Sequence, residues 1–305
     1  MTKAARLPRW LAMLLVACVA MTGCVPFAGQ QEQPPVEPTR TVGATRFAVI
    51  GDFGTGDSGE QAVADAIKKD DEKSGFDALV TVGDNVYPES RPKYFDQAWT
   101  KPYGWLKDKH IPVYAALGNH DEPNSKRTGP EESLLGMPGR WYTEQVGNVQ
   151  LIVLDANDVQ NAGQRRFLED VLAAPEPAGA VWRVVAFHQP AYSCSRHQST
   201  PDVQREWVPL FERSGVDLVL NGHDHVYQRF APIDGITYVV TGAAGSSLYE
   251  MHDCPAGTPE PAVAEVRSHY VVVETTGREL RIEAVTADAH MLDSQTIERG
   301  ATPAS

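Results

Sequence analysis

The sequence predicts an α/β fold in which two β-sheets form a sandwich, helices flank the sheets, and functional loops lie at the carboxyl ends of the strands. Short apolar runs rich in β-branched residues recur along the chain, as expected for strands buried on both faces. Stretches with helical spacing of apolar residues separate many of these runs. Polar motifs follow directly after several runs, where the ends of parallel strands would bring them together.

The expected strands and helices follow in order. Six apolar runs predict strands at 47–50, 78–82, 113–117, 151–154, 184–187 and 216–220. A helix is expected after Ser58, which could form a capping box with Gln61, and two more at 164–173 and 205–213. Pro209 should lie in the first turn of the last helix or kink it.

The C-terminal part has a different pattern. The segment 236–296 alternates between apolar and polar residues, which is typical of antiparallel strands. We expect strands at 237–240, 270–273 and 280–285, with turns at the Asp-Gly and Thr-Gly pairs that end at Gly235 and Gly277.

The N-terminus predicts export from the cytoplasm. Residues 1–23 combine three basic residues with an apolar stretch at 10–21, which is too short to span a bilayer as a helix. Small residues precede Cys24, as expected at a bacterial lipoprotein cleavage site that would leave the mature chain lipid-anchored. Cys18 also fits this pattern, and fits it better residue by residue. Cleavage there would, however, leave a very short apolar region and an apolar start of the mature chain, so Cys24 is preferred. An ordinary cleaved secretory peptide is the alternative.

The remaining chain divides into three parts. Residues 24–43 are expected to be a flexible tether, because the stretch 30–38 within them is polar and proline-rich. Residues 44–298 have globular composition and suit one domain. Residues 299–305 are expected to be a disordered tail.

The charge of the chain restricts its partners. The formal net charge is −13, and removing three basic residues with the signal segment leaves −16. Nucleic-acid binding through a basic face is therefore not expected. An anionic substrate would need a local cationic centre, and bound metal ions would provide one.

Two cysteines, Cys194 and Cys254, remain in the predicted domain. In an oxidising compartment such a pair predicts one disulfide joining two loops, while two thiols that bind metal are the alternative.

Five short motifs at strand ends supply metal ligands. Their donor residues are Asp52, Asp84, Tyr87, Asn119, His188, His223 and His225. Each motif alone could be an ordinary turn or a core histidine, but their joint occurrence indicates a site for two metal ions bridged by a carboxylate. Residues two apart in an extended segment face the same way, so His223 and His225 could address neighbouring metals.

The motif set resembles calcineurin-like metallophosphoesterases and, within them, small single-domain purple acid phosphatases. The resemblance covers about 47–243. It implies that Asp84 bridges two metals. One, normally Fe(III), would be held by Asp52, Asp84, Tyr87 and His225; a divalent Fe, Zn or Mn would be held by Asp84, Asn119, His188 and His223.

Two positions favour this branch. Many relatives that cleave phosphodiesters have histidine where this chain has Gly54, and Tyr87 could replace that missing donor with a phenolate. A hard anionic oxygen suits trivalent iron. Tyr87 could instead be a packing aromatic.

The resemblance also implies catalytic residues. His120 could protonate the leaving group, with Asp121 orienting it, and His197 matches a second substrate-binding histidine. We expect an exported, lipid-anchored phosphatase that hydrolyses small phosphomonoesters with hydroxide generated at the metal pair. A phosphodiesterase or nucleotidase is the first alternative, and a non-catalytic binding lipoprotein the second.

Overall fold

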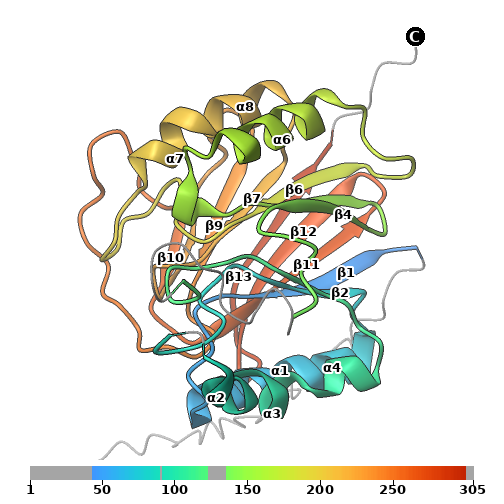
Figure 1. Cartoon of the computed structure of the whole chain (residues 1–305), viewed down its shortest axis with the longest axis vertical. Coiled ribbons are helices and arrows are strands. Elements are labelled where there is room, and N and C mark those ends of the chain that lie inside the picture. Colours follow the sequence, from blue (N-terminus) through green and yellow to red (C-terminus); the bar gives the residue numbers. More distant parts are fainter. Residues whose placement is uncertain (1–42, 90, 123–134, 300–305) are drawn as a thin grey trace, which may run out of the picture. The chain divides into compact units, whose positions relative to one another are not determined.

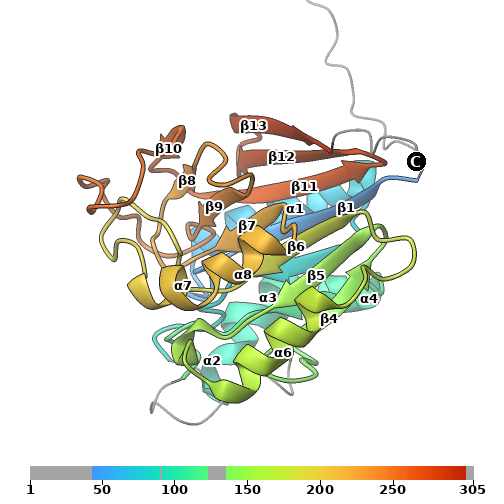
Figure 2. The same ribbon diagram turned by 90° about the horizontal axis from the view of Figure 1, so that it is seen from above.

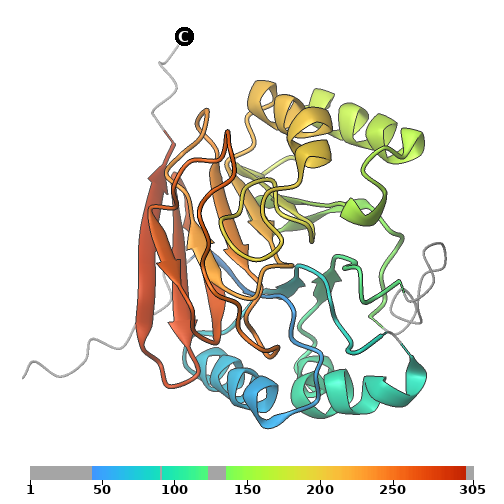
Figure 3. The ribbon, with the colours of Figure 1, turned by 90° about the vertical axis from the view of Figure 1, so that its left-hand side faces the viewer.

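Two mixed β-sheets stack face to face and carry helices on both outer sides (Figures 1 and 3). This computed structural model describes residues 43–89, 91–122 and 135–299, which belong to one compact unit. The arrangement confirms the predicted two-sheet α/β sandwich. The expected signal peptide, Cys24 and the tail from 300 onward lie outside the described residues.

The first sheet has six strands, and Figure 2 labels β13, β12, β11 and β1 side by side in this sheet. Their spatial order is β13 (Met291–Glu298), β12 (Glu279–Thr286), β11 (His269–Thr276), β1 (Thr45–Ile50), β2 (Ala78–Thr81) and β3 (Val113–Ala115). β1, β2 and β3 are parallel, whereas β11, β12 and β13 are antiparallel, as the alternating pattern predicts.

The second sheet has seven strands. Their order is β10 (Val263–Glu265), β8 (Tyr227–Arg229), β9 (Thr237–Thr241), β7 (Leu218–Asn221), β6 (Trp182–Ala186), β5 (Val149–Val153) and β4 (Tyr142–Val146). β5, β6, β7 and β9 are parallel neighbours. The expectation that the strand at 237–240 is antiparallel to its neighbours is therefore only partly correct. β9 is antiparallel to β8 but parallel to β7.

The strands are apolar on both faces because each face meets a different layer. On β1, Phe47 and Val49 lie in the core between the sheets, whereas Ala48 and Ile50 pack against the helices on the outer side of the first sheet. On β6, Val184 faces the other sheet, and Val185 faces the helices on the outer side of the second sheet.

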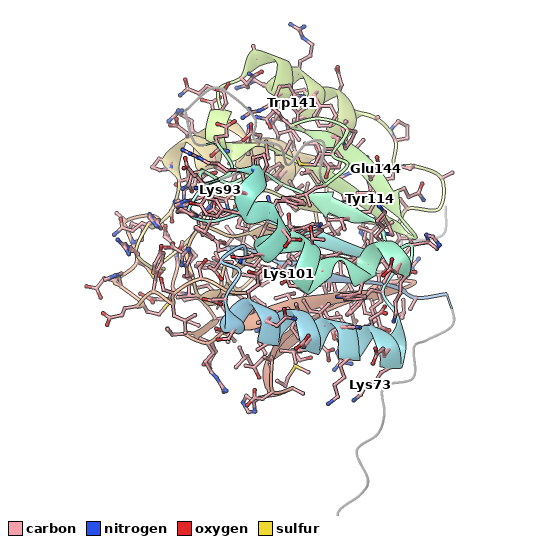
Figure 4. All side chains as sticks on the ribbon, turned by 60° about the horizontal axis from the view of Figure 1, so that its bottom comes forward. Lys73, Lys93, Lys101, Tyr114, Trp141 and Glu144 are labelled. Atoms are coloured by element: carbon pink, nitrogen blue, oxygen red, sulfur yellow. A yellow bond between two sulfur atoms is a disulfide. The ribbon has the colours of Figure 1, made fainter. Side chains whose placement is uncertain are left out.

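The first helical layer begins with α1 (Ser58–Ser74). The expected capping box is wrong, because Asp57 takes the cap position and its carboxylate accepts hydrogen bonds from the amides of Gly59 and Glu60. Four short helical pieces complete the layer: α2 (Pro92–Phe95), a π-helical turn (Asp96–Thr100), α3 (Lys101–Tyr103) and α4 (Trp105–Asp108). Lys73, Lys93 and Lys101 lie on the exposed side of this layer (Figure 4).

The second helical layer contains α6 (Ala162–Ala173), α7 (Pro201–Glu206) and α8 (Val208–Arg213). The expected helix at 205–213 is divided at Trp207, and Pro209 lies in the first turn of α8, where its missing N–H costs nothing. A 3₁₀ turn (Ala156–Asp158) precedes α6. None of the helices in the described part of the chain has the length and apolar character needed to cross a membrane.

Candidate metal centre

The predicted ligands meet at one edge of the two sheets. Asp52, Asp84 and Asn119 follow β1, β2 and β3, while His188 and His223 follow β6 and β7. Each of these strands is parallel to its neighbour within its sheet, so their carboxyl ends point to the same edge. The strand order thus explains why motifs far apart in the sequence come together.

The backbone turns sharply where three of these residues lie. Asp52, Asp84 and His223 have φ angles of 54°, 53° and 71°, in the left-handed region that non-glycine residues rarely adopt. Such conformations cost free energy and are concentrated at functional sites. Here they aim side chains into the space between the sheets' ends.

Asp52, Asp84 and His188 form a buried cluster that could hold a metal ion. One donor atom from each lies within 4.8 Å of the others. His188 Nε2 is 3.4 Å from Asp84 Oδ2 and 3.9 Å from Asp52 Oδ1. Two buried carboxylates at this separation require a nearby positive charge.

A first group of donors surrounds Asp52. The Tyr87 hydroxyl donates to Asp84 Oδ2 at 2.9 Å and lies 3.3 Å from Asp52 Oδ1. His225 Nε2 is 3.3 Å from Asp52 Oδ1 and 3.3 Å from the Tyr87 hydroxyl. Four donors, contributed by Asp52, Asp84, Tyr87 and His225, thus lie side by side.

A second group surrounds His188. Its Nε2 lies 3.1 Å from Asn119 Oδ1 and 3.2 Å from His223 Nδ1. Because the same Nε2 approaches Asp84 Oδ2, the two groups share Asp84. Carboxylate, imidazole, amide and phenol oxygens and nitrogens fit one iron and one divalent transition metal.

Backbone carbonyls orient two of the imidazoles. His188 Nδ1 lies 2.8 Å from the Val82 carbonyl and His225 Nδ1 lies 2.7 Å from the Ser247 carbonyl. These contacts place the proton on Nδ1 and leave each Nε2 as a lone-pair donor directed into the site. Such outer contacts are characteristic of metal-binding histidines.

The electrostatics of the cluster also favour a cation. Burial and the neighbouring carboxylates of Asp52 and Asp84 raise the pKa of Tyr87 far above its usual value. Although burial acts in the opposite direction, Asp84 and Asp52 raise the pKa of His188 to about 10. Burial and then His188 lower the pKa of His223 to about 2. A positive charge between the carboxylates is therefore strongly favoured, and a metal ion can supply it in place of the proton.

Gly54 is required by the position of the Tyr87 loop. A Cβ atom on Gly54 would lie 2.0 Å from the carbonyl oxygen of Asn85, and the Tyr87 amide donates to the Gly54 carbonyl at 2.6 Å. The loop that carries Tyr87 thus occupies the space that a side chain at position 54 would need. This contact gives a steric reason for the pairing of Gly54 with Tyr87.

The structure revises the role expected for Asp121. Its buried carboxylate accepts hydrogen bonds from the Asn85 amide, from the Asn85 side chain and from the Gly118 amide. It therefore joins the loop after β2 to the loop after β3. The ring of His120 is instead oriented by the Pro88 carbonyl, 2.7 Å from Nδ1, and this partly buried residue packs beside the Tyr87 ring at 4.5 Å between centroids.

His197 lies over the second group of donors. Its exposed ring is 4.0 Å, between centroids, from that of His223. Its backbone amide donates to Oδ1 of Asp224, a buried residue between the two histidine ligands of its motif. The sequence reasoning missed Asp224, although its position between two predicted ligands was a signal.

A disulfide joins Cys194 to Cys254 and links the loop that carries His197 to the loop after β9. That second loop contains Tyr249, whose ring stacks on His225 at 3.9 Å with an interplanar angle of 13°. No motif marked Tyr249, since it lies 24 positions beyond its partner.

Comparison with known proteins identifies the family. Residues 45–227 match the family described as calcineurin-like phosphoesterase. The chain belongs to this family. It is therefore a metal-dependent phosphoester hydrolase. Its purple acid phosphatase relatives suggest a dinuclear metal centre, and Asp52, Asp84 and His188 form a candidate site for metal in this chain.

Several relatives are purple acid phosphatases. Purple acid phosphatase 17 of Arabidopsis thaliana is 26% identical, over 77% of this phosphoesterase and 78% of the relative. A purple acid phosphatase from yellow lupin (Lupinus luteus) shares its fold with a TM-score of 0.70 and 20% identity, covering 85% of this chain and 54% of the other. GAP50, described as the anchor in the inner membrane complex of Plasmodium, shares the fold with a TM-score of 0.72 and 17% identity, covering 85% and 90%.

Proposed function

We propose that this phosphoesterase is a phosphomonoesterase of the purple acid phosphatase type. The observation that carries the proposal is the position of the Tyr87 hydroxyl, 2.9 Å from Asp84 and 3.3 Å from both Asp52 and His225. A phenol in this position adds a hard anionic donor to the first group, which favours a trivalent metal. The purple acid phosphatase relatives support the same assignment.

The assignment of ligands follows the two groups of donors. Fe(III) would be held by Asp52, Asp84, Tyr87 and His225, and a divalent Fe, Zn or Mn ion by Asp84, Asn119, His188 and His223. When bound, the two ions supply Lewis-acid stabilisation of the phosphoryl oxygens and a water of lowered pKa.

Protein side chains then bind the ester and move a proton. The Nδ1–H of His120 donates to the Pro88 carbonyl, so Nε2 is the ring nitrogen that can turn toward a bound ester. In its protonated form this imidazole can donate to the oxygen of the departing alcohol. His197, held over His223 by Asp224, can hydrogen-bond a phosphoryl oxygen from the other side.

We propose that the chain acts outside the cytoplasm, anchored through a lipid on Cys24. The basic and apolar N-terminal segment supports export, and a disulfide between Cys194 and Cys254 suits an oxidising compartment. In a bacterial host, Cys24→Ser should move the protein from the membrane to the soluble fraction, whereas Cys18→Ser should leave it membrane-bound. The reverse result would move the anchor to Cys18, and a wild-type protein in the soluble fraction would favour an ordinary secretory peptide.

Two alternatives define the experiment. A phosphodiesterase or nucleotidase would use the same donors with another substrate. A non-catalytic binding lipoprotein would keep the fold without turnover.

The deciding experiment compares hydrolysis of 4-nitrophenyl phosphate and bis(4-nitrophenyl) phosphate across pH by the metal-loaded protein. Asp84→Asn is the inactive control, and Asp288→Asn, at an exposed position, is the matched charge control. Strong monoester preference that only Asp84→Asn abolishes supports the proposal. Preference for the diester favours the first alternative, and absence of turnover with either ester favours the non-catalytic binding lipoprotein.

A further inference from the structure

A layered stack of side chains leads from a predicted metal ligand to the rim of the site. The Tyr249 ring lies parallel to the His225 ring at 3.9 Å. The guanidinium carbon of Arg196 lies 4.9 Å from the centroid of the Tyr249 ring. Because His225 already covers one face of this ring, the guanidinium occupies the other face. Tyr249 therefore separates a buried ligand from an exposed cation by one aromatic layer.

Two loops hold this stack in place. The backbone is held on both sides of Arg196, because Ser195 forms a β-bridge with Met251 and the His197 amide donates to Asp224 at 2.8 Å. The Ser195 hydroxyl also donates to the Glu250 carbonyl at 2.8 Å. The disulfide of the neighbouring Cys194 ties the same loop to the one that carries Tyr249. The backbone on both sides of Arg196 is thereby anchored to the site.

The charge of Arg196 is available to a ligand. Among the residues that the structure describes, no carboxylate forms an ion pair with it, and its contact is with the Tyr249 ring. Stacking covers the flat face of a guanidinium but leaves its N–H groups directed outward from the edge. The whole chain has a net charge of −13, so an unpaired arginine beside the site is a local exception to its surroundings.

We propose that Arg196, whose guanidinium group stacks on the ring of Tyr249, selects phosphate esters whose leaving group bears a second negative charge. The inference rests on the proposed phosphomonoesterase function and names the substrate class of that site. The phosphoryl group would be bound at the metal centre, while the guanidinium edge would hydrogen-bond the second anion on the departing part. Arg196 is thus a specificity-determining residue, and Tyr249 is a positioning residue that acts through it.

The test uses two esters that differ in one charge. 4-Carboxyphenyl phosphate carries the second anion, and 4-carbamoylphenyl phosphate has nearly the same size and shape without it. For the wild-type protein we expect kcat/KM for the carboxylate to exceed that for the amide by about threefold to fivefold, mainly through KM. In Arg196→Gln this ratio should fall to about one. Arg166→Gln, which removes the same charge from an exposed position on α6, should keep the wild-type ratio.

Binding without turnover gives a second readout. Calorimetric titration with 4-carboxybenzylphosphonate and 4-carbamoylbenzylphosphonate should show the same preference and the same loss in Arg196→Gln. Tyr249→Ala should also lose the preference, and Tyr249→Phe should retain it, because phenylalanine keeps the ring but not the hydroxyl. The preference should weaken as salt is raised, since the guanidinium is exposed.

The outcomes separate this inference from the proposed function. Turnover of both esters with equal KM in the wild type, or a ratio that Arg196→Gln leaves unchanged, would overturn the inference and leave the phosphomonoesterase intact. Absence of turnover with both esters would instead contradict the proposed function, and the phosphonate titrations would still decide whether Arg196 recognises the anion.

Discussion

The hydroxyl of Tyr87 donates a hydrogen bond to Oδ2 of Asp84 over 2.9 Å, although the two residues are only three positions apart in the same loop. Asp84 has a φ angle of 53°, in the left-handed region, and the loop that it begins contacts the loop after β1, where the Tyr87 amide donates to the Gly54 carbonyl at 2.6 Å. A phenolate beside two carboxylates is stable only near a strongly charged cation.

Removing this hydroxyl should remove the spectroscopic signature of iron. Iron-loaded protein should show a visible phenolate-to-iron absorption band, and Tyr87→Phe should lose it because the ring remains but the oxygen is gone. Tyr114→Phe, on the half-buried strand β3, serves as the control and should keep the band. Absence of the band in iron-loaded wild-type protein, or its persistence in Tyr87→Phe, would refute the assignment of Tyr87 as a ligand.

The carboxylate of Asp121 should stabilise the fold. Asp121→Ala would leave the Asn85 and Gly118 amides buried without this acceptor, so we expect a loss of about 3 kcal/mol in the free energy of unfolding. Denaturant unfolding measures this change. Asp65→Ala, on the exposed side of α1, should change stability by less than about 0.5 kcal/mol. A loss below about 1 kcal/mol in Asp121→Ala would contradict the loop-joining role.

Glu60 should make stability depend on pH. Its carboxyl group is buried under the Asp52 loop, where Oε2 accepts from the Gly56 amide and Oε1 has no partner among the described residues. Burial raises its pKa from an ordinary value near 4.5 to about 9. The folded state therefore keeps a proton that the unfolded state releases, and stability falls as pH rises from 4.5 toward 9.

Glu60→Gln removes this dependence while keeping the shape of the side chain. The stability of the variant relative to wild type should grow by up to about 1.4 kcal/mol per pH unit within this window. Urea unfolding at pH 5, 7 and 8.5 measures the difference, with Glu72→Gln on the exposed side of α1 as control. If the difference between Glu60→Gln and wild type were the same at all three pH values, the buried neutral carboxyl group would be ruled out.

Much of the fold and the ligand set could be predicted because both depend on local patterns. Buried parallel strands need continuous apolar runs. The residues after their carboxyl ends lie at the same edge of the sheet, and this does not depend on the length or composition of the segments between the strands. Asp52, Asp84 and His188 could therefore be recognised from their place after such runs. Because five such motifs occur together in one chain, these residues could be distinguished from residues of ordinary turns.

Other features could not be predicted because they depend on contacts between distant segments. The helical pieces between Pro92 and Asp108 are only three to five residues long, so their apolar spacing is too brief to show a period. The roles of Asp121 and Tyr249 depend on which loops lie next to each other. A carboxylate beside His120 in sequence looked like its partner, yet it points to Asn85.

The central claim is that Asp84 joins two metal sites, and metal content tests it most directly. Elemental analysis of the purified, reconstituted protein should find about two transition-metal ions per chain in wild type and in Asp288→Asn. Asp84→Asn should hold fewer than one, because loss of the shared carboxylate weakens both sites at once. If Asp84→Asn retained two ions, or if wild type hydrolysed phosphomonoesters with one ion or none, the bridged two-metal account would be wrong.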